Sequence, residues 1–265
     1  MMFRFNLSNY ELLLPEVDFF IEKIQLNTSF SFAKLNHAFW QMLNKDQPWL
    51  GIFEKIHKAE TIEECVSMLK NLPNDENFML GISSHGPPIV PNVKEGVKIG
   101  SEKSVISQLE KHIDINEKLY YGQMWKSFCI QKSFMNFMKC IGGKRVVLVG
   151  MKHLSDVGSF CGFRNFKHIV VELNTIEKYK NDILFDLKKE EEKSIIIFQC
   201  GEMMSFWFIY KLFGKDITMI DMGRSLDIFS NSEIDENTKN IIFDIEDQLW
   251  MKSVSSHAPL RKTFI

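Results

Sequence analysis

Several signatures of known protein classes are missing from this chain of 265 residues. No basic stretch followed by an apolar segment opens the chain, and no uninterrupted apolar run reaches the roughly 18 residues of a membrane-spanning helix. We therefore expect neither export nor a transmembrane segment. No CxxC pair occurs, and the cysteines are odd in number and widely spaced, which is typical of reduced core thiols in a cytoplasmic protein: Cys65, Cys129, Cys140, Cys161 and Cys200.

The usual metal and hydrolase motifs are also missing. The sequence contains no HxH, no HExxH, no Cys/His cluster and no DxD flanked by apolar strand residues, so it predicts no metal site. The one DxE, Asp244-Ile245-Glu246, lies in an acidic amphipathic pattern that indicates a solvated helix face. No GxSxG elbow occurs, so a serine hydrolase has little support.

An excess of charge of one sign is absent too. The chain has 32 Lys and Arg against 34 Asp and Glu, a net charge of −2, which gives no global reason to expect nucleic acid or an acidic membrane as partner. No internal repeat or low-complexity tract appears, and no signal for an oligomeric state is found. With 45% hydrophobic residues, the chain can form one large domain or two tightly joined halves.

The first part, residues 1–142, has a mixed, helix-rich pattern. Thr61 and Glu64 fit a capping box, so we expect a helix over 61–72. A second helical pattern covers 123–141 and stops at paired glycines. The other predicted elements are a helical start at Pro15 to Ile24 and short strands at Phe30 to Leu35 and Phe78 to Ile82.

The second part, residues 143–265, alternates short apolar runs with helical stretches. The runs are almost continuously hydrophobic, which predicts parallel strands covered on both faces and joined by right-handed crossovers. We therefore predict an α/β fold: a Rossmann-like, mostly parallel sheet flanked by helices, behind the helix-rich N-terminal part. The predicted strands are Arg145 to Val149, His168 to Val171, Ser194 to Gln199 and Ile217 to Ile220.

Polar or glycine-containing turns follow all four predicted strands, and in a parallel sheet these turns meet at one ligand-binding edge. Gly150 and Gly201 would let the backbone approach a ligand, and a helix starting near Glu202 would offer free N–H groups to a diphosphate. The alternative is that both glycines only make tight turns. The turns are Gly150 to His153, Glu172 to Asn174, Cys200 to Glu202 and Asp221 to Arg224.

Glu172 stands where dinucleotide and S-adenosylmethionine sites place an acid against ribose hydroxyls. A GxGxxG fingerprint is lacking, because the next glycine after Gly150 is Gly158. That spacing argues against a dehydrogenase-like dinucleotide site. It leaves open an S-adenosylmethionine-dependent methyltransferase that uses Gly150 and Glu172, and it also leaves open a surface role for Glu172.

Residues 194–227 resemble the C-terminal part of GT-D type glycosyltransferases. The resemblance is carried by Ser194 to Glu202, by the helix through Phe213-Gly214, and above all by Asp221-Met-Gly-Arg-Ser-Leu-Asp227, which is similar to the family's D-x-G turn. The stretches Val146 to Gly150 and His168 to Glu172 look like the family's first Rossmann strands. The resemblance implies transfer of a sugar from a nucleoside diphosphate sugar to a glycan or other hydroxyl acceptor, with the acceptor on the side of residues 1–142.

Upstream, the segment from Phe30 to Trp40 stands where that family has a strand leading into R-x-G-D-G-E. Lys34 matches the basic residue, but Asn36, His37 and Ala38 replace the acidic metal-and-substrate motif. We therefore expect no metal cofactor, with the nucleotide sugar as co-substrate. The same replacement leaves open a catalytically inactive nucleotide-binding module.

Sugar transfer without a metal needs cations for the leaving diphosphate and a base for the acceptor hydroxyl. Cation candidates are Lys34, Lys152 and Arg224, assisted by the backbone of Gly201 and Glu202.

The base candidates are His37, Glu202 and Asp221, and we favour Asp221 because it ends a strand. Further predicted substrate contacts are Asn36, Trp40, Gly150, Glu172, Asn174 and Gly223. The alternative roles are N-capping for Asp221 and core packing for Trp40 and His37.

Overall fold

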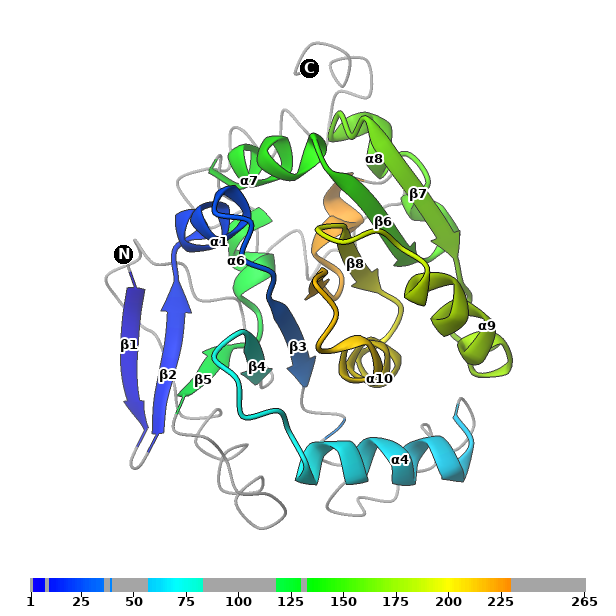
Figure 1. Ribbon diagram of the computed structural model, residues 1–265. Coiled ribbons are helices and arrows are strands. Elements are labelled where there is room, and N and C mark those ends of the chain that lie inside the picture. Colours follow the sequence, from blue (N-terminus) through cyan, green and yellow to red (C-terminus); the bar gives the residue numbers. More distant parts are fainter. Residues whose placement is uncertain are drawn as a thin grey trace.

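The computed structural model describes residues 2–7, 10–35, 39, 57–82, 118–129 and 133–229. In this part of the chain, one sheet of nine strands runs through both halves of the sequence in the order β1-β2-β5-β4-β3-β9-β8-β6-β7 (Figure 1). The strands are β1 (Met2–Leu7), β2 (Tyr10–Pro15), β3 (Ser31–Leu35), β4 (Phe78–Ile82), β5 (Lys118–Tyr121), β6 (Arg145–Gly150), β7 (Asn165–Val170), β8 (Ile195–Gln199) and β9 (Thr218–Asp221).

Every strand pair except β1 and β2 is parallel. The α/β fold with a mostly parallel sheet is therefore confirmed. The two halves of the sequence join where β3 pairs with β9, Ser31 opposite Met219 and Phe32 opposite Ile220. The helices are α1 (Val17–Gln25), α4 (Ala59–Lys70), α6 (Met124–Cys129), α7 (Ser133–Gly142), α8 (Val157–Phe160), α9 (Ile176–Lys188) and α10 (Glu202–Leu212), with 3-10 turns η1 (Lys152–Leu154) and η2 (Ser225–Phe229).

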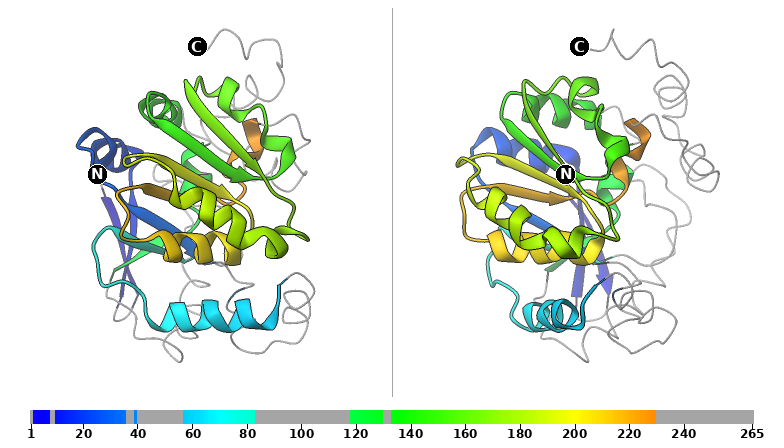
Figure 2. Two further views of the ribbon diagram at one scale, coloured as in Figure 1. Left: turned by 45° about the vertical axis from the view of Figure 1, so that its right-hand side comes forward. Right: turned by 90° about the vertical axis from the view of Figure 1, so that its right-hand side faces the viewer.

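Helix α10 lies between the sheet and α4, as the left view of Figure 2 shows. All of its residues from Met203 to Ile209 are buried, because the sheet covers one side and α4 the other. A helix that is apolar all round needs cover on every side. Trp207 Nε1 donates to Glu64 on α4 (2.7 Å), and Tyr210 donates to the carbonyl of Asn71 (2.7 Å). Helix α4 thus forms a third layer from the first half of the chain.

An aromatic cluster fills the other side of the sheet, under α1, α6 and α7. Phe20 lies 4.8 Å from Trp125 and 5.3 Å from Phe30, measured between ring centroids, and Trp125 lies 5.1 Å from Phe137. These side chains are almost fully buried. Edge-to-face and tilted rings at such distances add to the free energy of burying their large apolar area. The cluster ties the N-terminal helix to the strands of the join.

Three details of the predicted elements are wrong. The capping box at Thr61 does not form: the helix begins at Ala59, and the Thr61 hydroxyl donates to Glu177 on α9 (2.6 Å) because this buried carboxylate offers a better acceptor. The helix over 123–141 is instead two helices, α6 and α7. Strand β7 begins at Asn165, and the 51% exposure of Val170 shows that this edge strand is not covered on both faces.

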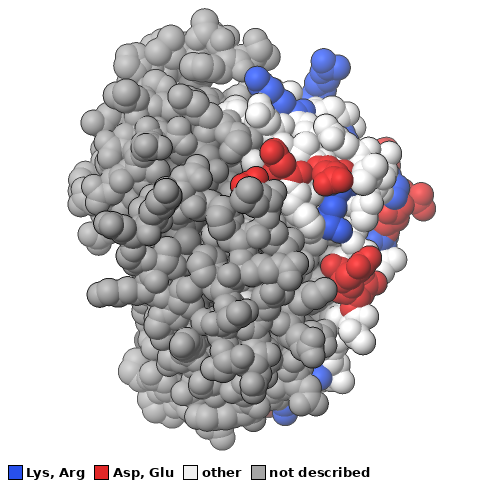
Figure 3. Space-filling model, turned by 90° about the vertical axis from the view of Figure 1, so that its left-hand side faces the viewer, with Lys and Arg blue, Asp and Glu red and all other residues white. Residues whose placement is uncertain are grey.

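The described surface carries charges of both signs. On the face shown in Figure 3, basic and acidic side chains are interspersed over the described part, in keeping with the net charge of −2. Within the described residues, no helix is both long enough and apolar enough to cross a bilayer.

Candidate functional site

The carboxyl ends of the parallel strands β3, β9, β8 and β6 lie at one edge of the sheet, which we call the carboxyl edge. From β6 the chain crosses to β7 on one side and then to β8 on the other, so the strand order reverses at β6. In open α/β sheets, such a reversal opens a crevice beyond the strand ends, and ligands bind there. The turns after β6, β8 and β9 are the ones to inspect.

Asp221 ends β9 and is only 2% exposed. Its Oδ1 accepts a hydrogen bond from the amide of Gly223 (2.8 Å), whereas no partner within the described residues reaches Oδ2. Burial raises the pKa of Asp221 to about 6, against the opposing effect of the positive charge on Lys34. A buried carboxyl oxygen without a partner is costly, and such groups concentrate where a ligand completes the pairing.

Lys34 and Gly223 meet at the same turn. Lys34 lies near the end of β3, the strand beside β9. Gly223 has a φ of +55°, a conformation that favours glycine, and a side chain at this position would collide with the Lys34 amine. The sequence places these residues 189 positions apart, as 223 minus 34, and the β3–β9 pairing brings them together.

A second polar cluster is centred on Asp227 in η2, whose side chain is 8% exposed. Its Oδ1 contacts His153 Nε2 (3.0 Å) and accepts from the Gln199 amide, and its Oδ2 accepts from Arg224 Nε (2.7 Å). Gln199 in turn accepts from the amide of Leu226 (3.2 Å). Both carboxylate oxygens of Asp227 are therefore held by the protein itself.

Sequence reasoning missed His153 and Gln199 as site residues. His153 was visible only as one of several polar residues after β6, and Gln199 as a polar end to an otherwise apolar strand. Gln199 gave one signal, because an amide at the last position of a buried strand needs hydrogen-bond partners. Gln199 is only 3% exposed. Its partners lie 27 and 28 positions away, on η2.

The two predicted phosphate-contacting glycines differ. Gly150 is buried, and a side chain there would meet Leu154 Cδ1 at 2.9 Å, so the protein's own packing explains this glycine. Gly201 is exposed, has a φ of +87° and directly precedes α10. The amides at the start of that helix face the carboxyl edge, as phosphate binding would require.

Other predicted residues lie around this edge with less definition. Lys152 is exposed at the start of η1, and Glu202 is partly exposed as the first residue of α10. Glu172 and Asn174 are exposed in the loop after β7. The predicted residues Asn36, His37 and Trp40 lie outside the residues that the structure describes.

In the described part of the chain, no group of three or more His, Cys, Asp or Glu side chains is placed to hold a metal ion. The segment of Asn36 to Ala38, where GT-D enzymes carry acidic residues, is not described. We derive no chemistry through a metal from the residues that are described.

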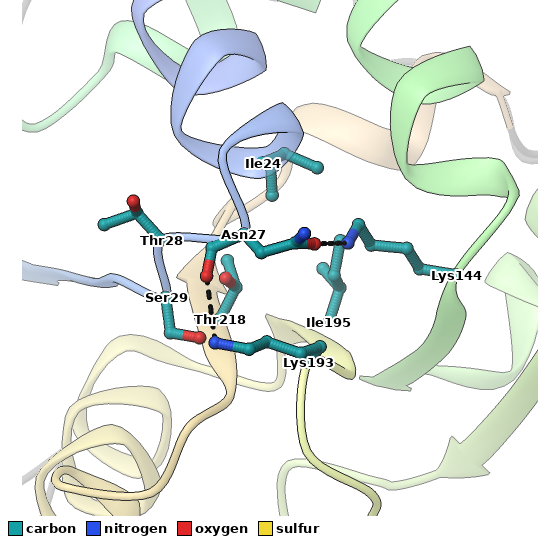
Figure 4. A pocket seen from close by; sticks show the side chains of 8 residues that line it. All are labelled: Ile24, Asn27, Thr28, Ser29, Lys144, Lys193, Ile195 and Thr218. Carbon is teal, nitrogen blue, oxygen red and sulfur yellow. Dashed lines mark hydrogen bonds between the residues drawn. The ribbon is translucent and has the colours of Figure 1, made fainter.

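The opposite edge of the sheet carries a polar cluster of another kind, which we call the amino-edge clamp: Asn27, Ser29, Lys144, Lys193 and Asp216. Figure 4 shows the first four of these residues. Lys144 donates to Asn27 Oδ1 (2.7 Å), Ser29 donates to Asp216 (2.6 Å), and Lys193 pairs with Asp216 (2.5 Å). The hollow beside them holds about 10 Å³, room for one water and too little for a sugar or phosphate.

A larger hollow of about 400 Å³ lies between the end of α7 and the turn after α8. None of the predicted site residues lines it. Its lining residues are Met135, Lys139, Gly142, Gly143, Phe160, Cys161, Gly162 and Arg164.

Comparisons with known proteins support the fold. Neither a scan against models of protein families nor a search of curated proteins gives a match. A solved structure described as the selenomethionine-substituted structure of domain of unknown function 1792 is similar, with a TM-score of 0.52 and 12% identity, over 77% of this chain and 76% of that one. This likeness shows a shared fold and nothing finer.

A second solved structure covers the same shares of the two chains at 12% identity, with a TM-score of 0.49, too low to base an inference on. The description of this second structure reads that the highly conserved domain of unknown function 1792 has a distinct glycosyltransferase fold. Both descriptions name the same domain, and the first structure shows that this chain shares its fold.

Proposed function

We propose that this protein is a glycosyltransferase that moves a sugar from a nucleoside diphosphate sugar to a hydroxyl acceptor at the carboxyl edge. Two findings support the proposal: the fold is shared with domain of unknown function 1792, and that domain is described as having a glycosyltransferase fold. Because a fold can host many activities, the local chemistry must carry the rest.

The observation that carries the proposal is the Asp221–Lys34 turn. It combines a buried carboxyl group, one oxygen of which has no partner among the described residues, with a cation from the neighbouring strand. With a pKa of about 6, Asp221 is ionised at neutral pH but only weakly acidic, which suits a general base for an acceptor hydroxyl. Lys34 supplies positive charge where a leaving diphosphate develops negative charge.

The remaining parts of the proposed site follow the strand ends. The amides after Gly201 form the start of α10 and would bind phosphate oxygens. Lys152 and Arg224 are exposed cations of the same edge. With these cations, and with Asn36, His37 and Ala38 in place of the acidic motif, we propose transfer without a metal ion.

A ligand panel tests the proposal directly. A ligand that binds the folded chain raises its stability by RT ln(1 + [L]/Kd), about 2.7 kcal/mol at a concentration of 100 times Kd. We expect UDP, GDP or CMP to raise the melting temperature equally with and without Mn²⁺. Stabilisation by S-adenosylmethionine alone would instead indicate a methyltransferase, and stabilisation by NAD alone a dinucleotide enzyme; either result refutes the proposal.

Turnover separates an enzyme from an inactive binding module. Once a stabilising nucleotide is known, release of that nucleotide from its sugar conjugates is measured for the wild type and for Asp221→Asn. General-base catalysis contributes about 100- to 10,000-fold, so we expect a loss in that range. Asp216→Asn at the amino-edge clamp is the control and should keep the wild-type rate. Nucleotide binding without turnover by the wild type contradicts the proposed activity.

A further inference from the structure

The proposed function gives no role to His153, Asp227 and Gln199, which form one cluster of the carboxyl edge with Arg224. This cluster lies at the reversal of strand order, because His153 follows β6 and Gln199 ends β8, the two strands on either side of the crevice. Crevices of this kind hold the phosphates of nucleotide ligands. The position of the cluster, more than its composition, suggests a contact with the diphosphate.

The geometry fixes His153 in one orientation. Its Nε2 lies 3.0 Å from Asp227 Oδ1, and Asp227 cannot turn away, because Gln199 and Arg224 hold its two oxygens. Asp227 is nearly buried, whereas the side chain of His153 is 28% exposed. Within the described residues, no hydrogen bond engages Nδ1 of His153. One ring nitrogen is thus anchored, and the other is left for a ligand.

The positive charges around the ring favour an anion beside it. Asp227 holds Nε2 in place, as a buried carboxylate orients the histidine of a proton-transfer pair. Arg224 and Lys152 add positive charge nearby. His168 on β7 bonds to the Gly150 carbonyl; burial lowers its pKa, and the charge of His153 lowers it further. Among the described residues, the other helices that pack against η2 contribute Lys126 on α6 and Asp156 at the start of α8.

We propose that His153, anchored by Asp227, binds the leaving diphosphate and protonates it. This inference rests on the proposed function. As the bond between the sugar C1 and the β-phosphate oxygen breaks, its electron pair stays on that oxygen, which takes the Nδ1 proton of His153. The acceptor oxygen forms the new bond to C1 and loses its proton to Asp221. Solvent then returns the proton to His153 and removes the one on Asp221.

Pyrophosphate binding tests the role of His153 without knowledge of the sugar. The affinity of the full chain for inorganic pyrophosphate is measured by calorimetry at about pH 5.5 and about pH 8, on either side of the ordinary imidazole pKa of about 6.5. Because pyrophosphate itself titrates in this range, the quantity compared is the ratio of wild-type to variant affinity at each pH.

His153→Gln is the central variant, since its amide can still donate to Asp227 but cannot carry the positive charge. We expect the ratio of wild-type to variant affinity to be roughly tenfold larger at pH 5.5 than at pH 8, as for one ion pair in a partly exposed site. His168→Gln, at the neighbouring histidine, is the matched control and should follow the wild type at both pH values. His153→Lys should retain tight binding at pH 8.

The outcomes separate this inference from the proposed function. If UDP or GDP binds but His153→Gln follows the wild type at both pH values, the sugar transfer proposal stands and the role of His153 is refuted. If pyrophosphate binding depends on His153 but no nucleotide binds, the phosphate contact stands and the nucleotide-sugar proposal fails. Failure of the wild type to bind pyrophosphate at either pH refutes the inference.

Discussion

Both edges of the sheet are rich in polar residues, but the two edges differ in how completely these residues are hydrogen-bonded. At the amino-edge clamp, Lys193 pairs with Asp216, Ser29 donates to the same carboxylate, and Lys144 is bonded to Asn27. At the carboxyl edge, Asp221 is buried with one oxygen unpartnered by any described residue. The comparison teaches that the number of polar residues says little about function, whereas buried groups that the protein leaves unpaired are informative.

The largest expected contrast is between the two multiply bonded carboxylates, Asp227 at the carboxyl edge and Asp216 at the amino edge. Asp227→Ala leaves the buried Gln199 amide without its acceptor at a site that is 8% exposed, so we expect a loss of about 2 to 3 kcal/mol in the free energy of unfolding. Asp216 is 39% exposed, and Asp216→Ala should cost less than about 1 kcal/mol. Urea denaturation measures both; equal losses would contradict the distinction between the edges.

The second contrast is in the sign of a pH effect. Burial raises the pKa of Asp221 from 3.8 to about 6 in the folded chain, so the unfolded chain loses this proton first and stability falls as the pH rises from 3.8 to about 6. The full loss is present above about pH 6, whereas well below the unfolded pKa both states carry the proton. Asp221→Asn should therefore stabilise the protein by about 2 to 3 kcal/mol at pH 8 and leave it unchanged near about pH 3.

Asp216 provides the matched control for this pH effect. The hydrogen bond from Lys193, followed by that from Ser29, lowers the pKa of Asp216. A lowered pKa stabilises the folded state above the unfolded pKa, and the benefit is lost as the pH falls through the folded value. Asp216→Asn should therefore destabilise the protein at pH 8, opposite in sign to Asp221→Asn. The measurement is the free energy of unfolding of both variants and the wild type across this pH range. A stability change of the same sign in both variants at pH 8 would refute the contrast.

The smallest contrast is between two glycines with positive φ, Gly223 at the carboxyl edge (+55°) and Gly214 before β9 (+92°). Replacement by alanine should cost each about 1 to 2 kcal/mol of backbone strain. Only Gly223→Ala also displaces the Lys34 amine, whereas no atom of the described residues lies within 4 Å of a side chain at Gly214. We expect nucleoside diphosphate affinity to fall about tenfold for Gly223→Ala and to stay unchanged for Gly214→Ala. Parallel losses in the two variants would remove Lys34 from the binding site.

The sequence predicted the central strands well, because their physical signal is local. Strands β6, β8 and β9 are short, continuously apolar and buried, and each ends within one residue of the predicted position. The predicted start of edge strand β7 lies three residues late, since the polar Asn165 and Lys167 flank Phe166 and interrupt the apolar run. Strands β1, β2 and β5 were missed; β5 has only four residues.

The site was predictable only in part, because its contacts are not local. Asp221 and Gly201 could be found from the rule that ligands bind at strand ends. The pairing of His153 with Asp227 spans 74 positions, and no spacing pattern indicates it. Thr61 shows the converse: its local motif predicted a helix cap, and a carboxylate 116 positions away took its hydroxyl instead.

The position of β3 between β4 and β9 has a consequence for biosynthesis. Ser29 and Asp216, which bond just before these strands, are 187 positions apart. At a synthesis rate of about 5 to 20 residues per second, roughly 10 to 40 seconds separate the emergence of the two partners. During that interval one edge of β3 has no neighbour, and a bare apolar strand edge is a template for aggregation. The nascent chain therefore depends on β9, the last strand of the described residues, to cover the open edge of β3.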